Sequence, residues 1–244
     1  MSQQDISVFV INLSHRLDRR RFMRSQLTKL GIRFHFFDAV TPGTIPSDFR
    51  EKVVETARRW LCSHYLSPEE QACYASHYAL WSYSMENKRP IIVLEDDIRI
   101  SSKIKNYLSQ SVFEGKEYVS LKDHPRVANI DDVFCLRKVS HGAMGYFISP
   151  HAASTLIRKS DLAENVDTFI GNGYRHGLIP WGLNRPVVRI KPMEFGTDIQ
   201  FSRWSGERDR LSKKIARILY RTHRSITNKI RIWYLKLRIW YLKQ

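Results

Sequence analysis

The stretch SVFVINLSHRLDRRRFMRSQLTKLGIRFHFFD, residues 7–38, decides the fold. Its apolar run over 7–11 is typical of a buried strand. Apolar side chains recur on one face of a helix over 17–30, and Gly31 is a typical helix stop. Alternating apolar residues over 32–36 predict a second strand. Two parallel strands joined by a crossover helix indicate an α/β protein.

The size and composition of the chain indicate a globular protein. The 244 residues are enough for one large domain or two small ones, and 43% of them are hydrophobic. Three scattered cysteines exclude a disulfide scaffold or a zinc knuckle. The start has no signal-peptide pattern and is followed by no apolar run long enough to cross a bilayer. We therefore expect a soluble, cytoplasmic protein.

Positive charge is concentrated at the C-terminal end. The net charge is +16, and residues 208–244 hold 12 Lys and Arg against one Asp. Apolar residues, many of them Ile and Trp, recur there at steps of three and four. A basic amphipathic helix with aromatic residues is typical of binding to an anionic membrane surface. A helix that docks on the body of the protein is the alternative.

Further helices and strands are predicted along the body. Ser67-Pro68-Glu69-Glu70 has the pattern of a capping box at the start of a helix that runs to about residue 86. The apolar run over 91–94 predicts a buried strand, and Ser149-Pro150 predicts another helix start. Later candidate strands are 118–121, 133–136, 143–148 and 187–190.

Three carboxylates, Glu95, Asp96 and Asp97, directly follow the strand over 91–94. Ligands of open α/β sheets bind beyond the carboxyl ends of the strands. Adjacent acids repel one another, so a divalent cation is the simplest way to neutralise them. Glu95 and Asp97 could hold Mg²⁺ or Mn²⁺, whose other positions accept diphosphate oxygens. The alternative is a solvated acidic turn.

Basic residues cluster after the first strand, at Arg16, Arg19, Arg20 and Arg21. Guanidinium groups near a helix start suit phosphate groups. For Arg20 and Arg21, a solvated helix face is the favoured interpretation. His77, within the predicted helix over 67–86, is either a packed residue or a site histidine that faces the strand ends.

Four blocks of sequence resemble glycosyltransferase family 25, which includes bacterial lipooligosaccharide galactosyltransferases and glucosyltransferases. The first is residues 8–40, and the second, CYASHYALWSYSMENKRPIIVLEDDIRI (73–100), is similar to the family's "SH…W…LEDD" segment. The third, GAMGYFISPHAASTLI (142–157), and the short NVDTF (165–169) follow in the family's order. The ordered blocks are more specific than any one motif.

The resemblance implies a GT-A-like fold, a single Rossmann-type α/β domain that binds a UDP-sugar. We place this domain at 1–207, and the charge and apolar pattern of 208–244 predict a membrane-association segment there. It implies transfer of a hexose, galactose before glucose, with inversion, to a hydroxyl of a growing lipooligosaccharide. The cofactor would be Mn²⁺ or Mg²⁺. The partners would be a UDP-hexose, a lipid-linked oligosaccharide and the anionic inner face of the cytoplasmic membrane, and no nucleic acid is expected.

The resemblance also assigns site residues. Asn12, Leu13 and Arg16 would lie near the nucleotide, and Arg19 near its diphosphate. Glu95, Asp96 and Asp97 would form the DxD-like site for ribose and metal, with Asp97 as the leading metal ligand. The remaining site residues are Asp167 as the catalytic base, with a structural or metal-adjacent role as its alternative, and His77, Gly142 and Tyr146 as lining residues.

This chain departs from the family pattern at two places. Residues 69–73 read EEQAC where relatives often have GEIGC, and residues 39–43 read AVTPG where the pattern is "A.dG". Both affect the loops around the donor, and so the choice of sugar. Two other classes of function stay open at this stage: a nucleic-acid-binding protein or metal-dependent nuclease that uses the same acids, and a non-catalytic relative that binds a membrane or a partner.

Overall fold

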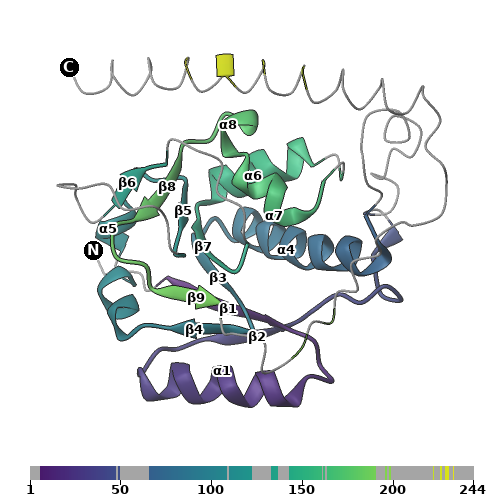
Figure 1. The fold of residues 1–244 in the computed structure, drawn as a ribbon, viewed down its shortest axis with the longest axis vertical. Coiled ribbons are helices and arrows are strands. Elements are labelled where there is room, and N and C mark those ends of the chain that lie inside the picture. Colours follow the sequence, from purple (N-terminus) through teal and green to yellow (C-terminus); the bar gives the residue numbers. More distant parts are fainter. Residues whose placement is uncertain are drawn as a thin grey trace.

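The structure is a computed structural model that describes residues 6–47, 49, 66–108, 110–122, 133–136, 143–160, 162, 164–190, 196, 198, 222, 226, 229–230 and 233. The described residues form a seven-stranded sheet with helices on both faces, which confirms the α/β class (Figure 1). Most of residues 208–244 lie outside the described residues, so the predicted C-terminal helix stays a prediction.

The large sheet combines parallel and antiparallel strands. In spatial order its strands are β2 His35–Asp38, β1 Ser7–Asn12, β3 Ile91–Glu95, β7 Gly145–Ile148, β5 Tyr118–Ser120, β8 Pro180–Leu183 and β6 Val133–Cys135. β7 and β6 run antiparallel to their neighbours, and the other strands share one direction. A separate antiparallel ribbon pairs β4 (Ile98–Ile100) with β9 (Val188–Ile190).

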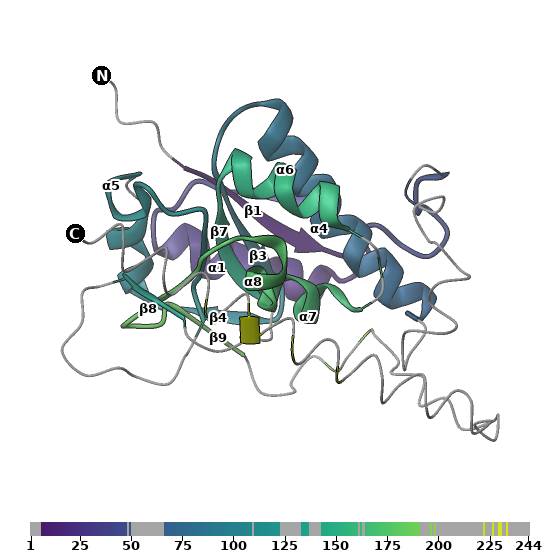
Figure 2. The ribbon, with the colours of Figure 1, turned by 90° about the horizontal axis from the view of Figure 1, so that it is seen from above.

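Helices cover both faces of the large sheet. One face carries α1 Leu17–Lys29, the 3₁₀-helix η1 Ser102–Tyr107 and α5 Gln110–Phe113; the other carries α4 Pro68–Glu86, α6 Pro150–Lys159, α7 Val166–Gly171 and the short α8 Gly173–His176. Seen from above, α4 and α6 lie side by side over the sheet, with α1 beneath it (Figure 2). Each face therefore encloses its own apolar core.

The strand period of two assigns side chains to these two cores. In β3, Ile91 and Val93 belong to the core under α4, whereas Ile92 and Leu94 belong to the core over α1. All four side chains are buried, as expected for a strand covered on both faces. The alternation continues past Leu94, and it therefore decides which side each of the following acids faces.

The first βαβ unit is present, but its second strand lies later than predicted. The strand runs over His35–Asp38 instead of 32–36. The Ile32 backbone N–H donates to the Leu27 carbonyl at 3.0 Å, and the N–H of Gly31, whose φ is +65°, donates to Thr28. These bonds form a Schellman cap, so Ile32 completes the helix end and cannot join the sheet.

The predicted capping box is present at the start of α4. The Ser67 hydroxyl accepts from the Glu70 N–H at 3.2 Å, and the Glu70 carboxylate accepts from the Ser67 N–H at 2.8 Å, with Pro68 in the first turn. This end of the helix is therefore specified locally. The Ser149-Pro150 start of α6 is also confirmed.

Two strands of the structure were absent from the sequence prediction. β4 is only three residues long, and its partner β9 lies about 90 residues later in the chain. β8 begins with Pro180 and includes Gly182, two residue types that argue against a strand. Both strands form because of their tertiary partners, which local patterns do not reveal.

The sheet topology brings the predicted site residues together. β1 and β3 are adjacent and parallel, and Ile11 pairs with Glu95. Asn12 and the three acids therefore lie at the same edge of the sheet, beside the N-terminal end of α1. This edge is where a doubly covered α/β sheet binds its ligands.

Candidate active site

The three acids after β3 face different sides of the sheet. Glu95 faces the α4 side, where its Oε1 lies 3.7 Å from His77 Nε2. Asp96 faces the α1 side and is 6% exposed. Asp97 is the last residue of the turn before β4, and its side chain is 44% exposed. Asp97 is therefore the most accessible of the three carboxylates.

Asp96 is held in a buried network. Its carboxylate accepts from Asn12 Nδ2 at 2.7 Å and from the Arg19 guanidinium at 2.9 Å. Arg19 is itself 7% exposed and lies in the first turn of α1. These bonds fix the end of β1 to the end of β3 and to α1. Asp96 is therefore committed to protein partners, while Asp97 remains accessible.

Asp198 joins this site from the distant C-terminal part of the body. Its carboxylate accepts from Arg16 at 2.6 Å and lies 3.2 Å from Arg19. The Gly196 carbonyl also accepts from Arg19, at 2.6 Å. Since Arg19 also lies 3.8 Å from Asp97, the two exposed acids share one guanidinium. Sequence reasoning missed Asp198 because no local pattern surrounds it.

A buried aromatic chain orients His77. The Trp81 indole N–H donates to the Tyr146 hydroxyl at 2.9 Å, and this hydroxyl lies 2.9 Å from His77 Nδ1. Because indole can only donate, the Tyr146 hydroxyl proton is free to point at Nδ1. Burial lowers the pKa of His77 to about 4, so the ring is neutral near pH 7. A tautomer in which Nδ1 accepts from Tyr146 would carry its proton on Nε2, 3.7 Å from Glu95 Oε1.

Glu95 lies in an acidic environment. Burial raises its pKa well above the ordinary value, and the nearby carboxylates of Asp167, Asp97 and Asp96 raise it further. Asp167 lies in the first turn of α7, where its Oδ1 accepts from the Ala143 N–H at 2.5 Å. The Glu95 and Asp167 carboxylates therefore come from elements about 70 residues apart in the sequence.

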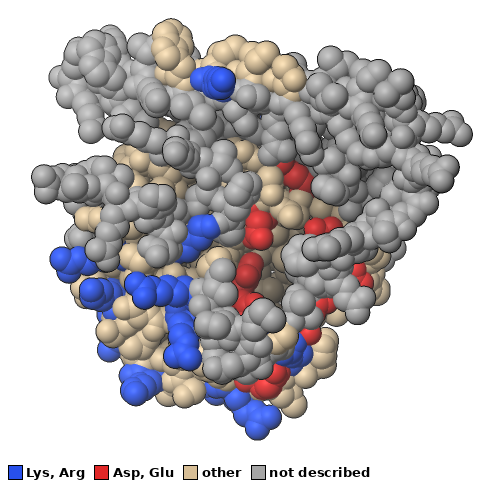
Figure 3. All heavy atoms as spheres, viewed as in Figure 1, with Lys and Arg blue, Asp and Glu red and all other residues tan. Residues whose placement is uncertain are grey.

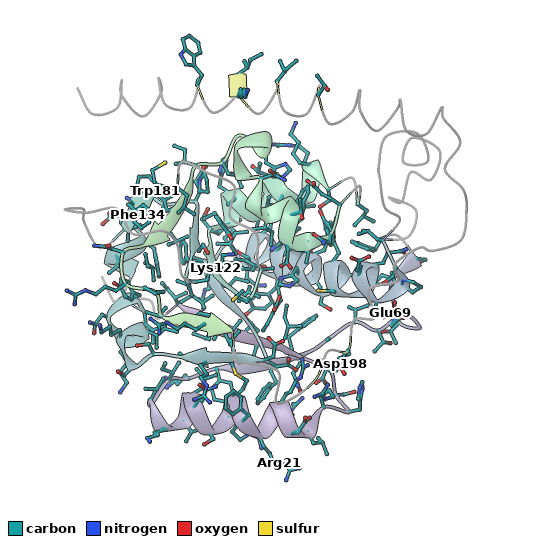
Figure 4. The ribbon with its side chains drawn as sticks, in the orientation of Figure 1. Arg21, Glu69, Lys122, Phe134, Trp181 and Asp198 are labelled. Carbon is teal, nitrogen blue, oxygen red and sulfur yellow. The ribbon has the colours of Figure 1, made fainter. Side chains whose placement is uncertain are left out.

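Lys122 is a second site residue that sequence reasoning missed. It follows β5 and forms a bridge with Val188 of β9. Burial lowers its pKa, while the charges of Asp167 and Glu95 favour its protonated form. Figure 4 shows it in the middle of the molecule, away from Asp198 beside α1. The rule that ligands meet strand ends would have pointed to it.

The other residues that the sequence analysis singled out have different surroundings in the structure. Leu13 is half-buried, and its carbonyl closes a turn with the Arg16 N–H at 2.8 Å. Arg20 pairs with Asp38 and stacks on Phe36, while Arg21 points away from the body (Figure 4). Gly142 lies outside the described residues.

The acids of the site suit a hard divalent cation in their chemistry. Among the described residues, no three His, Cys, Asp or Glu side chains are arranged to hold a metal ion. Mg²⁺, however, commonly takes one or two carboxylates and completes its shell with water and phosphate oxygens. Around the sheet edge, five carboxylates (Glu95, Asp96, Asp97, Asp167 and Asp198) face three cations (Arg16, Arg19 and Lys122). The excess negative charge and the exposed Asp97 carboxylate fit such an ion.

Comparison with known protein families identifies the chain. Residues 5–128, which hold β1, α1, α4 and the three acids, match the family described as "Glycosyltransferase family 25 (LPS biosynthesis protein)". The chain belongs to glycosyltransferase family 25. The resemblance noted from the sequence blocks is thereby confirmed.

Several of the similar proteins are bacterial and are named for lacto-N-neotetraose or lipooligosaccharide biosynthesis. The lacto-N-neotetraose biosynthesis glycosyltransferase LgtE of Neisseria gonorrhoeae is 29% identical over 51% of this chain and 43% of its own length. LgtB of Neisseria meningitidis serogroup B is 32% identical over 43% of this chain and 37% of its own. Lipooligosaccharide biosynthesis protein lic2B of Haemophilus influenzae is 29% identical over 42% and 37%. The chain thus spans about two fifths of these relatives.

The described part of the tail exposes three large apolar side chains together with a threonine and a lysine. Thr222, Ile226, Lys229, Ile230 and Trp233 are helical and exposed, and their spacing places them on one side of a helix. The exposed fractions of Ile226, Ile230 and Trp233 are 53%, 60% and 65%. None of the described helices is both long enough and apolar enough to span a bilayer.

Proposed function

We propose that this protein is a UDP-sugar-dependent hexosyltransferase of lipooligosaccharide biosynthesis. The observation that supports this most is the group of acids at the carboxyl end of β3, beside Asn12 of β1 and with Arg16 and Arg19 next to them, in a chain of family 25. The donor is a UDP-hexose, with galactose favoured over glucose, and the acceptor is a lipid-linked oligosaccharide. The domain over 1–207 carries the reaction and has a GT-A-like fold.

The proposed reaction is a single displacement with inversion. An acceptor hydroxyl oxygen bonds to the anomeric carbon while the bond from that carbon to the UDP oxygen breaks. Asp167, held by the Ala143 N–H, takes the hydroxyl proton. Asn12, Leu13 and Arg16 lie beside the nucleotide, and His77 and Tyr146 shape the floor of the site. Asp97, with Glu95, would hold Mn²⁺ or Mg²⁺, which supplies stabilisation of the negative charge on the diphosphate.

Asp97→Asn tests this assignment. Asparagine keeps the shape of the side chain but removes the charge that holds the cation, so we expect metal-dependent transfer to fall at least about 100-fold, as for loss of a transition-state charge contact. The melting temperature should change little because Asp97 is half-exposed. Transfer is measured as UDP release across a Mn²⁺ titration. Near-normal turnover of a folded Asp97→Asn variant would contradict the metal assignment.

The tail over 208–244 completes the proposal. Its basic residues and the exposed Ile226, Ile230 and Trp233 favour binding to an anionic membrane surface over docking on the body. A lipid-linked acceptor lies at the inner face of the cytoplasmic membrane, so we place the protein there as a peripheral protein. Confinement at this surface raises the local concentration of enzyme and acceptor.

A further inference from the structure

A basic pocket lies beside the β4–β9 ribbon. Its volume is about 490 Å³, within the range of sites for small ligands. Its charged lining residues are Arg99 of β4, Lys103 of η1, Arg185, and Arg189 of β9. No acid is among the described residues that line it. The pocket therefore carries four positive charges in a volume that fits one or two sugar units.

The cations of this pocket form no ion pair with any acid that the structure describes. Within the described part of the chain, no carboxylate lies within 4.0 Å of any of the four. Arg16, at the N-cap of α1, and Arg19 and Arg20, within its first turn, behave differently, since each of them pairs with an aspartate. Among the described residues the four cations are therefore not neutralised by ion pairs, and their charge can attract an external anion.

The ribbon places two of these arginines directly opposite each other. Arg99 of β4 pairs in register with Arg189 of β9, so their Cβ atoms are about 5 Å apart. Like charges at this position destabilise a sheet. Alternation puts both side chains on the exposed face, while Ile98 and Val188 pack in the core. A like-charge pair that destabilises the free protein is expected at a position where a bound ligand neutralises the two charges.

The pocket is fixed close to the candidate active site. β4 begins directly after Asp97, and Arg99 follows two residues later, about 7 Å along the strand. The Val188 N–H donates to the Leu121 carbonyl at 3.1 Å, which ties β9 to the end of β5 beside Lys122. In Figure 3, Lys and Arg side chains gather over the region of β4 and β9, next to the acidic side chains at the centre.

We propose that this pocket binds a phosphate group carried by the acceptor saccharide, on a sugar next to the one whose hydroxyl reacts. The statement rests on the proposed function, which supplies the acceptor. Guanidinium forks match phosphate oxygens with paired hydrogen bonds. A phospholipid headgroup offers the same chemistry, but the concave pocket on the face of the acids suits a sugar phosphate better than a flat bilayer surface. The acceptor is thus recognised by charge as well as by its hydroxyl.

The test compares Arg99→Gln/Arg189→Gln with Arg158→Gln/Lys159→Gln. The control removes two exposed cations from the end of α6, outside the pocket. The affinities of the full-length chain for glucose 6-phosphate and glucose are measured with UDP and Mn²⁺ present, so that a donor site is filled. We expect the wild type and the control to prefer glucose 6-phosphate by about tenfold or more, and the pocket variant to lose this preference.

A stability measurement separates binding from folding. Because the pocket variant removes a like-charge pair, its melting temperature should equal or exceed that of the wild type. A folded pocket variant that keeps the preference for glucose 6-phosphate would overturn the proposal. A marked fall in melting temperature would overturn it as well, since the arginines would then hold the ribbon together.

Three further outcomes identify which proposal fails. If the wild type binds UDP but shows no preference for glucose 6-phosphate, the phosphate pocket is wrong and the proposed function stands. If it prefers glucose 6-phosphate through Arg99 and Arg189 but does not bind UDP, the anion site stands and the transferase function is contradicted. If phosphatidylglycerol vesicles compete with glucose 6-phosphate for a chain that lacks 208–244, the occupant is a lipid headgroup, which overturns the acceptor assignment.

Discussion

Arg19 illustrates how one residue can support the fold and the site together. The resemblance placed it beside the diphosphate, whereas in the structure its guanidinium contacts Asp96, Asp198 and the Gly196 carbonyl. Its side chain is 8% exposed and that of Asp96 is 9% exposed. A charge buried to this extent is stable only while its partner is present. Arg19 therefore has a structural role, in which it ties Gly196 and Asp198 to α1, and its place beside the diphosphate stays a prediction.

We predict that Arg19→Ala lowers the free energy of unfolding by about 3 kcal/mol or more, because it leaves the buried Asp96 carboxylate without its cation. Arg21→Ala is the matched control: it removes an exposed arginine from the same helix and should change the free energy by less than about 0.5 kcal/mol. Urea unfolding of both variants measures the difference. Equal stability of the two would show that the Arg19–Asp96 pair is not structural.

The residue types at the site could be predicted from the sequence more readily than the partner of each charged side chain. Glu95, Asp96 and Asp97 could be located because they follow a strongly apolar run, and His77 because it lies on a well-capped helix. Asp198 and Lys122 could not be assigned in this way, since their partners lie far away in the sequence. Residue types and strand ends can be derived locally, but the partner of each charge depends on tertiary structure.

At the level of elements, Gly145 decides how β9 lies against the sheet. A Cβ atom at this position would lie 3.0 Å from Val188 Cγ2, 3.2 Å from its Cγ1 and 3.4 Å from Leu94 Cδ2. Gly145 therefore allows β9 to pack closely over β7. Because β9 pairs with β4, this contact also holds in place the β4–β9 ribbon, which begins directly after Asp97 and lines the basic pocket.

We expect Gly145→Ala to destabilise the protein by about 1–3 kcal/mol through overpacking against Val188. In Gly145→Ala/Val188→Ala, the space freed by the smaller side chain should accommodate the new methyl group. The double variant should therefore be more stable than the sum of the two single changes predicts, which urea unfolding of all three variants measures. Strict additivity would rule out this contact as the cause.

Element prediction succeeded where local signals were complete. The capping box of α4, the Gly31 stop of α1 and the apolar run of β3 each specify a boundary without tertiary help. The strand predicted at 32–36 was misplaced because Ile32, although apolar and buried, is used in the cap of α1. β4 was missed because three residues carry too little periodicity, and β8 because Pro180 and Gly182 argue against a strand.

At the level of the whole molecule, charge is divided between two regions. Residues 208–244 hold 12 Lys and Arg against one Asp, whereas the rest of the chain holds 28 against 23. The described tail residues Ile226, Ile230 and Trp233 expose apolar side chains. This division is expected of a catalytic body with a separate surface-binding segment.

Deletion of residues 208–244 should therefore abolish most binding to phosphatidylglycerol vesicles while leaving transfer to a water-soluble acceptor analogue intact. Cosedimentation and UDP release measure the two properties on the same protein. Vesicles of phosphatidylcholine serve as the uncharged control, and binding to anionic vesicles should weaken as salt is added. A truncated chain that still sediments with anionic vesicles would assign membrane binding to the body, or to no specific segment.

The melting temperature of the full-length chain with UDP-, GDP- and CMP-sugars, each with and without Mn²⁺, tests the central claim most directly. A ligand that binds only the folded state raises the melting temperature by mass action. We predict a rise with UDP-sugars together with Mn²⁺, larger for UDP-galactose than for UDP-glucose, and a much smaller response to the other nucleotides. The absence of a rise with any nucleotide sugar would contradict the transferase function.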